Sequence, residues 1–205
     1  MRIVSLNAWG GRLWDDLRPW VLGLGADVLC LQEVTRALEP SPPWLIFRDA
    51  EFNLDQRADL YAEICALLPA HRAQFCAAAR GRLSDADGKW YASEHGIAVW
   101  IAPGLALTEQ IQRFAHGTFG VDGWGTHPVP RSLHGLRLYD PASGRFVVLV
   151  HLHGLRDAAG KHDTPARAAQ AEAICALIAD LRQPGDGVVV AGDLNLLPDS
   201  ATFAA

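Results

Sequence analysis

The chain has 205 residues, of which 50% are hydrophobic and 20% are charged, and its formal net charge at pH 7 is −5. This composition excludes intrinsic disorder, collagen and coiled coils, and it predicts a globular chain folded as a single domain over residues 1–205. The 18 Lys and Arg residues against 23 Asp and Glu residues lack the basic excess of a protein that holds nucleic acid mainly through phosphate charge.

The sequence contains no secretory signal pattern at its start, and no apolar stretch approaches the ~20 residues that cross a bilayer. We therefore expect no transmembrane segment. The four cysteines lie far apart, and three of them fall in apolar strand or helix patterns, where a free thiol behaves as a small hydrophobe: Cys30, Cys65, Cys76 and Cys175. A reducing, cytoplasmic location fits this pattern best. The oligomeric state is not predictable from these features.

In the first half of the chain, apolar runs of strand length alternate with amphipathic stretches of helix length, which indicates an α/β fold. The pattern predicts strands over residues 2–6 and 27–31, and helices over residues 13–24 and 58–68. Pro19 requires that the first helix start late or kink.

The second half continues the alternation. It predicts strands over residues 96–101, 136–139, 146–152 and 188–191, and a late helix whose apolar stripe runs over residues 171–181. Thr164 and Pro165 are a suitable cap and first residue for that helix. Two connections are expected to be long loops, residues 80–95 and 114–134. Each is either a lid over a substrate or a variable surface insertion.

Polar groups follow four of the predicted strands, and this recurrence is the main functional signal. The residues are Asn7, Glu33, the pair His151 and His153, and the pair Asp193 and Asn195. Ends of neighbouring strands lie at one rim of a sheet, where such groups can meet without burying a charge in the core. Taken singly, Glu33 also fits a solvated loop carboxylate, and Asn7 fits a turn residue that bonds its own backbone.

Two of these groups allow more than one interpretation. Because His151 and His153 are two residues apart in a strand, they point to the same face, so one can be catalytic and the other a buried core histidine. The same pair is also compatible with a zinc site, for which His162 and Asp163 are additional candidate ligands. Gly192 permits a sharp turn after the last strand, which exposes Asp193 and Asn195.

Five segments together resemble the endonuclease/exonuclease/phosphatase superfamily in order and spacing: IVSLNAWG at 3–10, DVLCLQEV at 27–34, HLHGLRD at 151–157, RAAQA at 167–171 and AGDLNLLPD at 191–199. The resemblance spans nearly the whole chain. It implies a four-layer α/β sandwich, in which two packed mixed β-sheets have helices outside. It also implies divalent-metal-dependent hydrolysis of phosphate esters, as in nucleases, phosphodiesterases and phosphatases, usually with Mg²⁺ and in some cases Mn²⁺.

The resemblance also implies a role for each candidate residue. Glu33 would be the principal metal ligand, with Asn7 beside it orienting the metal or the phosphate. His153 would bind the scissile phosphate, with His151 as the fallback. Asp193 would orient or deprotonate the attacking water, and Asn195 would donate to a phosphate oxygen. Arg167 is expected to have a structural role at the start of a helix.

One family feature has no match in this chain. Relatives continue past the GDxN segment into strands that end in a Ser-Asp-His signature, and the sequence up to Ala205 contains no such segment. We therefore expect a C-terminally incomplete member of the fold, with an open sheet edge. The leading hypothesis is a phosphoric ester hydrolase acting on nucleic acid, a phospholipid or an inositol phosphate. The alternatives are a catalytically incomplete remnant acting as a binding module, and a zinc hydrolase using His151 and His153.

Overall fold

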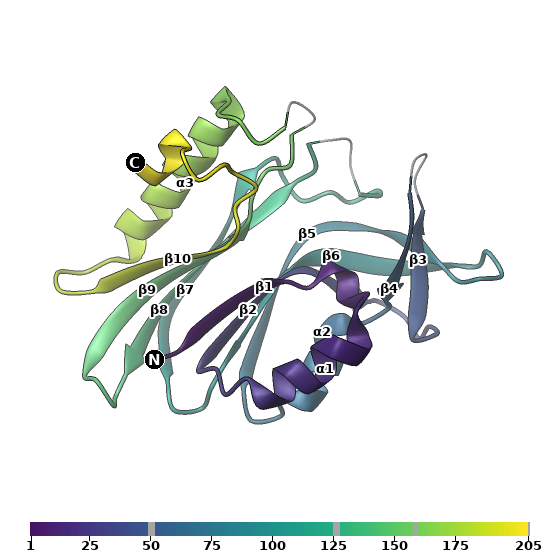
Figure 1. Ribbon diagram of the computed structural model, residues 1–205, viewed down its shortest axis with the longest axis horizontal. Coiled ribbons are helices and arrows are strands. Elements are labelled where there is room, and N and C mark those ends of the chain that lie inside the picture. The colour runs from purple at the N-terminus through teal and green to yellow at the C-terminus, as the bar shows by residue number, and fades with distance from the viewer. Residues whose placement is uncertain (49–51, 125–127, 158–159, 205) are drawn as a thin grey trace.

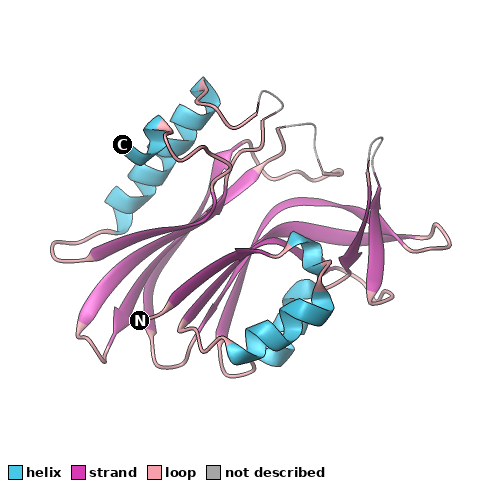
Figure 2. Ribbon diagram, viewed as in Figure 1, coloured by secondary structure: helices cyan, strands magenta, loops and turns pink. Residues whose placement is uncertain are grey.

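The computed structural model describes residues 1–48, 52–124, 128–157 and 160–204. In this part of the chain two mixed β-sheets pack face to face, and α-helices lie on the outer faces of both sheets (Figures 1 and 2). This arrangement confirms the four-layer α/β sandwich predicted from the sequence.

The first sheet has six strands in the order β1-β2-β6-β5-β3-β4. Its members are β1 (Ile3–Asn7), β2 (Val28–Ala37), β3 (Trp44–Arg48), β4 (Asn53–Arg57), β5 (Arg72–Ser84) and β6 (Trp90–Ile101). β1 and β2 run parallel, and the other neighbours are antiparallel. Side chains alternate along β2, so that Val28 and Cys30 face the second sheet while Leu29 and Leu31 face the helices.

The second sheet has four strands in the order β10-β9-β8-β7. They are β7 (Ala106–His116), β8 (Arg131–Asp140), β9 (Arg145–His153) and β10 (Gly187–Asp193). β9 and β10 are parallel neighbours, and α3 (Pro165–Leu181) connects them. Val148 and Val150 of β9 pack against α3, whereas Leu149 faces the first sheet, so both surfaces of this strand are buried.

The helices begin where the sequence predicts. α1 (Trp14–Gly23) contains Pro19 in its interior, and α2 (Leu60–Leu67) is capped by the Asp59 side chain, which accepts a hydrogen bond from the Ala62 N–H. At the start of α3, the Thr164 side chain accepts from the Arg167 N–H, as its cap position predicts. Two short 3-10 turns complete the set, η1 (Trp9–Gly11) and η2 (Ala201–Ala204).

The prediction of a loop over residues 80–95 is wrong, because these residues form the end of a long antiparallel hairpin. β5 and β6 pair from Arg72 with Ile101 to Ser84 with Trp90, and a short turn follows in which Asp85 N–H donates to the Lys89 carbonyl. Residues 72–84 are rich in alanine and arginine and contain no β-branched side chain, so local composition carried little strand signal. The backbone hydrogen bonds with β6 hold these residues in a strand despite their low strand propensity.

The expected loop over residues 114–134 is shorter than predicted, because β7 extends to His116 and β8 begins at Arg131. Residues 125–127 of this segment lie outside the described residues. The preceding part is fixed to β5, since Gly120 N–H donates to the Ala78 carbonyl and Arg80 N–H donates to the Gly120 carbonyl. A lid function for this segment stays a prediction.

β10 is an outer strand of its sheet. Val188 and Val190 are paired in register with Val148 and Val150, which α3 covers, yet both β10 valines are exposed. All four cysteines are free thiols. Of the helices in the described ranges, none is both long enough and apolar enough to cross a bilayer.

Candidate active site

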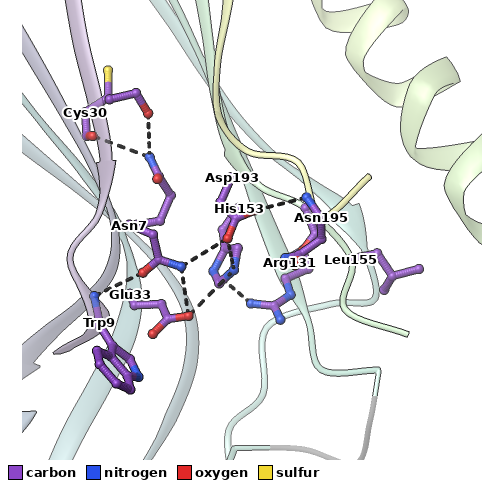
Figure 3. Close-up of polar contacts among 12 residues, drawn as sticks. Asn7, Trp9, Cys30, Glu33, Arg131, His153, Leu155, Asp193 and Asn195 are labelled. Atoms are coloured by element: carbon purple, nitrogen blue, oxygen red, sulfur yellow. Dashed lines mark hydrogen bonds and ion pairs between the residues drawn. The ribbon is translucent and has the colours of Figure 1, made fainter. Parts of the chain in front are cut away.

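Four strand segments from both sheets bring polar side chains to one mouth of the sandwich (Figure 3). Asn7 ends β1 and Glu33 lies in β2, both in the first sheet, while His153 ends β9 and Asp193 ends β10 in the second. Parallel pairing sets Asn7 beside Gln32 and Asp193 beside His153, so each sheet delivers its groups at the same end. The convergence predicted from the strand ends is therefore present.

The Asn7 side-chain amide joins the two carboxylates. Its Nδ2 lies 3.1 Å from Glu33 Oε1 and 3.1 Å from Asp193 Oδ2, and its Oδ1 accepts a hydrogen bond from the Trp9 N–H at 3.0 Å. Because an ionised carboxylate can only accept, the NH₂ end of the amide must face both of them. Asn7 thus holds two carboxylates from different sheets close together. The second lone pair of its Oδ1 can still accept a hydrogen bond or bind a cation.

Glu33 reaches this position through a β-bulge. The register between β2 and β6 shifts between Leu31 and Val34, and Glu33 has a φ of 54°, in the left-handed region that side chains other than glycine rarely adopt. The strand therefore continues beyond Glu33, whereas the sequence pattern placed this residue after the strand end. The bulge turns one carboxylate out of a strand that is otherwise buried.

Asp193 is positioned by close backbone contacts at the ends of β9 and β10. Gly192 has a φ of 149°, and a Cβ at this position would lie 1.9 Å from the Leu152 carbonyl oxygen, so only glycine fits. Gly154 N–H then donates to the Asp193 carbonyl at 2.6 Å. The sharp turn predicted from Gly192 is present, and it sets the direction of the Asp193 side chain.

His153 lies between the carboxylates and a buried arginine. Its Nε2 is 3.8 Å from Glu33 Oε1 and 3.9 Å from Asp193 Oδ2, and its Nδ1 is 3.0 Å from Arg131 Nη1. Because a guanidinium only donates, His153 Nδ1 must accept, and a neutral imidazole then carries its hydrogen on Nε2. Burial, with the positive charge of Arg131 in second place, lowers the pKa of His153 well below its usual value, so the ring is neutral at pH 7.

The electrostatics of the mouth favour a cation together with an anionic ligand. Burial lowers the pKa of Arg131, while the nearby Glu33 and Asp193 carboxylates act in the opposite direction and help to retain its charge. Arg156 also lies near enough for its charge to act on Arg131 and His153, so two carboxylates and two guanidinium groups stand around the neutral His153 ring. The Glu33 and Asp193 side chains are 24% and 33% exposed, so solvent or a ligand can reach their carboxylate groups.

The donor set fits magnesium better than zinc. No group of three or more His, Cys, Asp or Glu side chains within the described ranges is arranged to hold a metal ion. Mg²⁺ does not need such a cage, because it binds through one or two carboxylates and keeps several waters or substrate oxygens. Glu33 and Asp193, bridged by Asn7, are a set of this kind. Zinc usually requires three or four nitrogen, sulfur or carboxylate ligands.

His151 is separated from this cluster. It is fully buried, its Nε2 lies 2.7 Å from Gln32 Nε2, and it is paired across the strands with His134. The Gln32 side-chain nitrogen occupies the Nε2 side of this ring. Of the two additional candidate ligands for zinc, His162 is exposed, and the Asp163 carboxylate accepts hydrogen bonds from the Ser200 hydroxyl and the Ala201 N–H. The structure gives the zinc interpretation no support.

Asn195 lies next to Asp193 and shares the left-handed backbone of Glu33, with a φ of 54°. Its N–H donates to Asp193 Oδ1 at 3.0 Å, and its side-chain Nδ2 donates to the Gly154 carbonyl at 3.2 Å. In this arrangement Asn195 braces Asp193. The donation of Asn195 to a phosphate oxygen stays a prediction, as do the catalytic roles expected of the other site residues.

Arg167 has the structural surroundings that the sequence suggested. Its guanidinium is buried and donates to the backbone carbonyls of Leu155, Gly160 and His162. It thereby ties the segment after β9 to the start of α3, away from the carboxylates.

Sequence reasoning missed Arg131 and Trp9 as members of the mouth. Arg131 falls in the segment 114–134 that was expected to be a loop, although it begins β8 and contacts His153. Trp9 follows Asn7 by two residues, donates its N–H to Asn7 Oδ1 and is exposed (Figure 3). An arginine at a strand start and an exposed tryptophan beside a polar strand end are the signals that would have found them.

Solved structures with the same fold support this description. The chain is similar to an endonuclease/exonuclease/phosphatase from Bacteroides vulgatus, at 16% identity and a TM-score of 0.60, over 95% of this chain and 61% of that one. It is also similar to the mannosyl-6-phosphatase Bt3783 of Bacteroides thetaiotaomicron, at 16% identity and a TM-score of 0.62, over 98% and 68% of the two chains. For the human Nocturnin catalytic domain with bound sulfate the identity is 18% and the TM-score 0.60, over 100% and 67%.

The chain thus spans about 61–68% of the length of these three structures. No curated protein sequence matches it. The sequence profile of the Endonuclease/Exonuclease/phosphatase family, however, matches residues 4–205. That range contains all the groups at the mouth, from Asn7 to Asn195, and the chain accordingly belongs to the Endonuclease/Exonuclease/phosphatase family.

Proposed function

We propose that this chain hydrolyses phosphate esters with the help of a divalent cation, Mg²⁺ in the first instance and Mn²⁺ as a substitute. The observation that carries the proposal is the pair of carboxylates, Glu33 and Asp193, held from opposite sheets by the Asn7 amide. A pair of partly exposed carboxylates beside a buried arginine suits a cation that bridges the protein and a phosphate group.

Glu33 and Asn7 are the residues that would hold the cation. A bound Mg²⁺ would neutralise phosphate oxygens and lower the pKa of a coordinated water. Asp193 accepts one hydrogen bond at each carboxylate oxygen, from Asn7 at Oδ2 and from the Asn195 N–H at Oδ1, which fixes its direction. A remaining lone pair of this carboxylate would orient the attacking water and accept its proton.

His153 and Arg131 serve the phosphate. Since Arg131 donates to Nδ1, the His153 Nε2–H points toward the space beside the carboxylates and can donate to a non-bridging phosphate oxygen. Such a donor, fixed before the reaction, stabilises the charge that develops in the transition state. The human Nocturnin domain with bound sulfate shows that a protein of this fold can hold a tetrahedral anion. The substrate we propose is a phosphate ester of the nucleic acid, phospholipid or inositol phosphate type.

The central experiment is Mg²⁺-dependent hydrolysis of bis(p-nitrophenyl) phosphate by the whole chain. We predict that Asp193→Asn lowers turnover by about 10²-fold or more, because the amide cannot accept the proton of water. Asp180→Asn is the matched control, since Asp180 is a half-exposed carboxylate of α3 that pairs with Arg113. Turnover by Asp193→Asn equal to that of the control would remove Asp193 from the mechanism.

The same assay separates the alternatives. A wild-type chain that hydrolyses no member of a broad panel of phosphate esters, and that binds Mg²⁺ only weakly in calorimetry, would favour the non-catalytic binding module. Stoichiometric zinc in elemental analysis of the purified protein would favour the zinc hydrolase.

A further inference from the structure

We propose that Trp9, Arg12 and a cavity under the β3–β4 hairpin form a subsite for a nucleobase, next to the carboxylate pair. The proposal rests on the proposed function, because it assigns a chemical class to the group that is attached to the phosphate. Nothing in the hydrolytic mechanism uses these residues, so the subsite concerns substrate choice rather than bond cleavage.

The position of Trp9 is the first observation. Its backbone has a φ of 49°, a rare conformation for a bulky residue, and its side chain is nevertheless 46% exposed. Burial in the core therefore does not compensate the strained backbone. Strain of this kind concentrates at functional sites. The Trp9 N–H donates to Asn7 Oδ1, and Asn7 in turn donates to both carboxylates (Figure 3), so the strained turn ties this aromatic residue to the candidate active site.

The turn that carries Trp9 is held firmly. A Cβ on Gly10 would lie 2.7 Å from Gln56 Cγ, and one on Gly11 would lie 2.6 Å from Arg57 Cγ, so both glycines press against β4. Both also have positive φ values. The η1 turn is thus packed directly on the β3–β4 hairpin, and the indole ring has a fixed base.

Arg12 extends the surface from Trp9 into the cavity. Its guanidinium carbon is 4.7 Å from the centroid of the Trp9 ring, which forms a cation–π contact. Arg12 also lines a cavity of about 380 Å³, together with Trp44, Ile46, Asp55 and Ala86. Trp44 is fixed by Arg57, whose guanidinium carbon is 4.6 Å from its ring, and 40% of Trp44 remains exposed. The surface thus begins at the Trp9 ring, continues over Arg12 and ends at the Trp44 ring in the cavity.

The polar groups of the cavity are available for a ligand. Among the described residues, no hydrogen bond or ion pair engages the side chains of Arg12 or Asp55, although both line the same cavity. The Arg12 guanidinium can only donate hydrogen bonds, and the Asp55 carboxylate can only accept them. A flat ring with hydrogen-bond acceptors and donors along one edge would therefore complement both side chains. Nucleobases have such edges, and their flat faces stack on tryptophan and arginine planes.

The test compares ligands that share the phosphate and differ in the base. Calorimetry with Mg²⁺ measures the Kd of GMP, of AMP and of ribose 5-phosphate for the whole chain. We expect at least one nucleotide to bind about tenfold more tightly than ribose 5-phosphate, since stacking of one base contributes that much or more. Equal Kd values for all three ligands would overturn the proposal.

Variants then locate the effect. Trp9→Ala and Arg12→Gln should each reduce the advantage of the nucleotide over ribose 5-phosphate, whereas Trp20→Ala, which changes an exposed tryptophan of α1 that does not line the cavity, should leave it unchanged. Arg12→Gln changes only an exposed side chain, so it keeps the test decisive if Trp9→Ala fails to fold. An advantage that survives both variants would contradict this location.

The two proposals can fail separately. If bis(p-nitrophenyl) phosphate is not hydrolysed but the nucleotides bind in a Trp9-dependent manner, the subsite stands and the proposed hydrolysis falls. If hydrolysis depends on Asp193 while a base adds nothing to binding, the hydrolysis stands and the subsite falls.

Discussion

At the scale of single residues, the site is built from backbone conformations that cost free energy. Glu33 and Asn195 both have a φ of 54°, and Trp9 has a φ of 49°. Within the described part of the chain, no other residue except glycine has a positive φ, and all three lie at the mouth. A left-handed residue with a side chain costs on the order of 1 kcal/mol or more relative to glycine. The fold therefore gives up stability where it places its functional groups.

A pair of substitutions at Glu33 isolates this cost. Glu33→Ala and Glu33→Gly both remove the carboxylate and should both abolish Mg²⁺-dependent hydrolysis. They differ only in the Cβ, so we expect Glu33→Gly to have a free energy of unfolding about 1 kcal/mol higher than Glu33→Ala. Urea unfolding monitored by circular dichroism measures the difference. An alanine variant at least as stable as the glycine variant would show that the bulge carries no such strain.

At the scale of elements, the ends of β9 and β10 position half of the site. Their parallel register brings Asp193 beside His153, and the carbonyl of Leu152 lies against Gly192. The connection therefore depends on close contact between two backbones, which glycine alone allows. The β3–β4 hairpin has the corresponding role on the other side, where it supports the turn that carries Trp9.

Gly192→Ala tests this contact. A Cβ 1.9 Å from the Leu152 oxygen forces the strand ends apart, so we expect a loss of about 2 kcal/mol or more in the free energy of unfolding. Hydrolysis should fall as well, because Asp193 moves with its neighbour. Gly23→Ala is the control, since a Cβ there meets nothing within 4 Å. Equal stability of the two variants would mean that β10 adjusts freely and does not fix Asp193.

At the scale of the whole molecule, two sheets meet over a layer that contains titratable groups as well as apolar ones. His151 of β9 lies against Gln32 of β2, and His134 of β8 is its cross-strand neighbour. Burial lowers the pKa of His134 to about 4. Burial, with a smaller contribution from His134, lowers the pKa of His151 to about 3. Both rings are therefore neutral when the sheets are packed.

This layer makes stability depend on pH. In the unfolded chain both histidines have pKa values near 6.5, so below that pH the unfolded state takes up protons that the native state does not. We expect the free energy of unfolding to fall as pH drops from about 6.5 toward 4, by up to about 1.4 kcal/mol per pH unit for each histidine. Urea unfolding at pH 7 and pH 5 measures the slope. His151→Gln should flatten it, whereas the exposed His162→Gln should not; equal slopes in both variants would contradict the assignment.

Local patterns in the sequence were sufficient for much of the architecture. The run at 146–152 and the apolar stripe that Thr164 caps became β9 and α3 because periodicities of 2 and 3.6 residues are local properties of a chain. The hairpin of β5 and β6 was missed for the opposite reason, since residues 72–84 show little strand propensity and are held by pairing with β6. β3, β4 and β7 were missed as well, and each is paired antiparallel with a neighbouring strand.

The sequence by itself determined which chemical groups the strands carry to the mouth: an amide at Asn7, carboxylates at Glu33 and Asp193, and an imidazole at His153. Only the tertiary structure decided that one amide nitrogen bridges both carboxylates, that Arg131 sets the protonated nitrogen of His153, and that Trp9 stands beside them. The physical reason is that these contacts join residues up to 186 positions apart, whose distances depend on strand register and on the packing of two sheets.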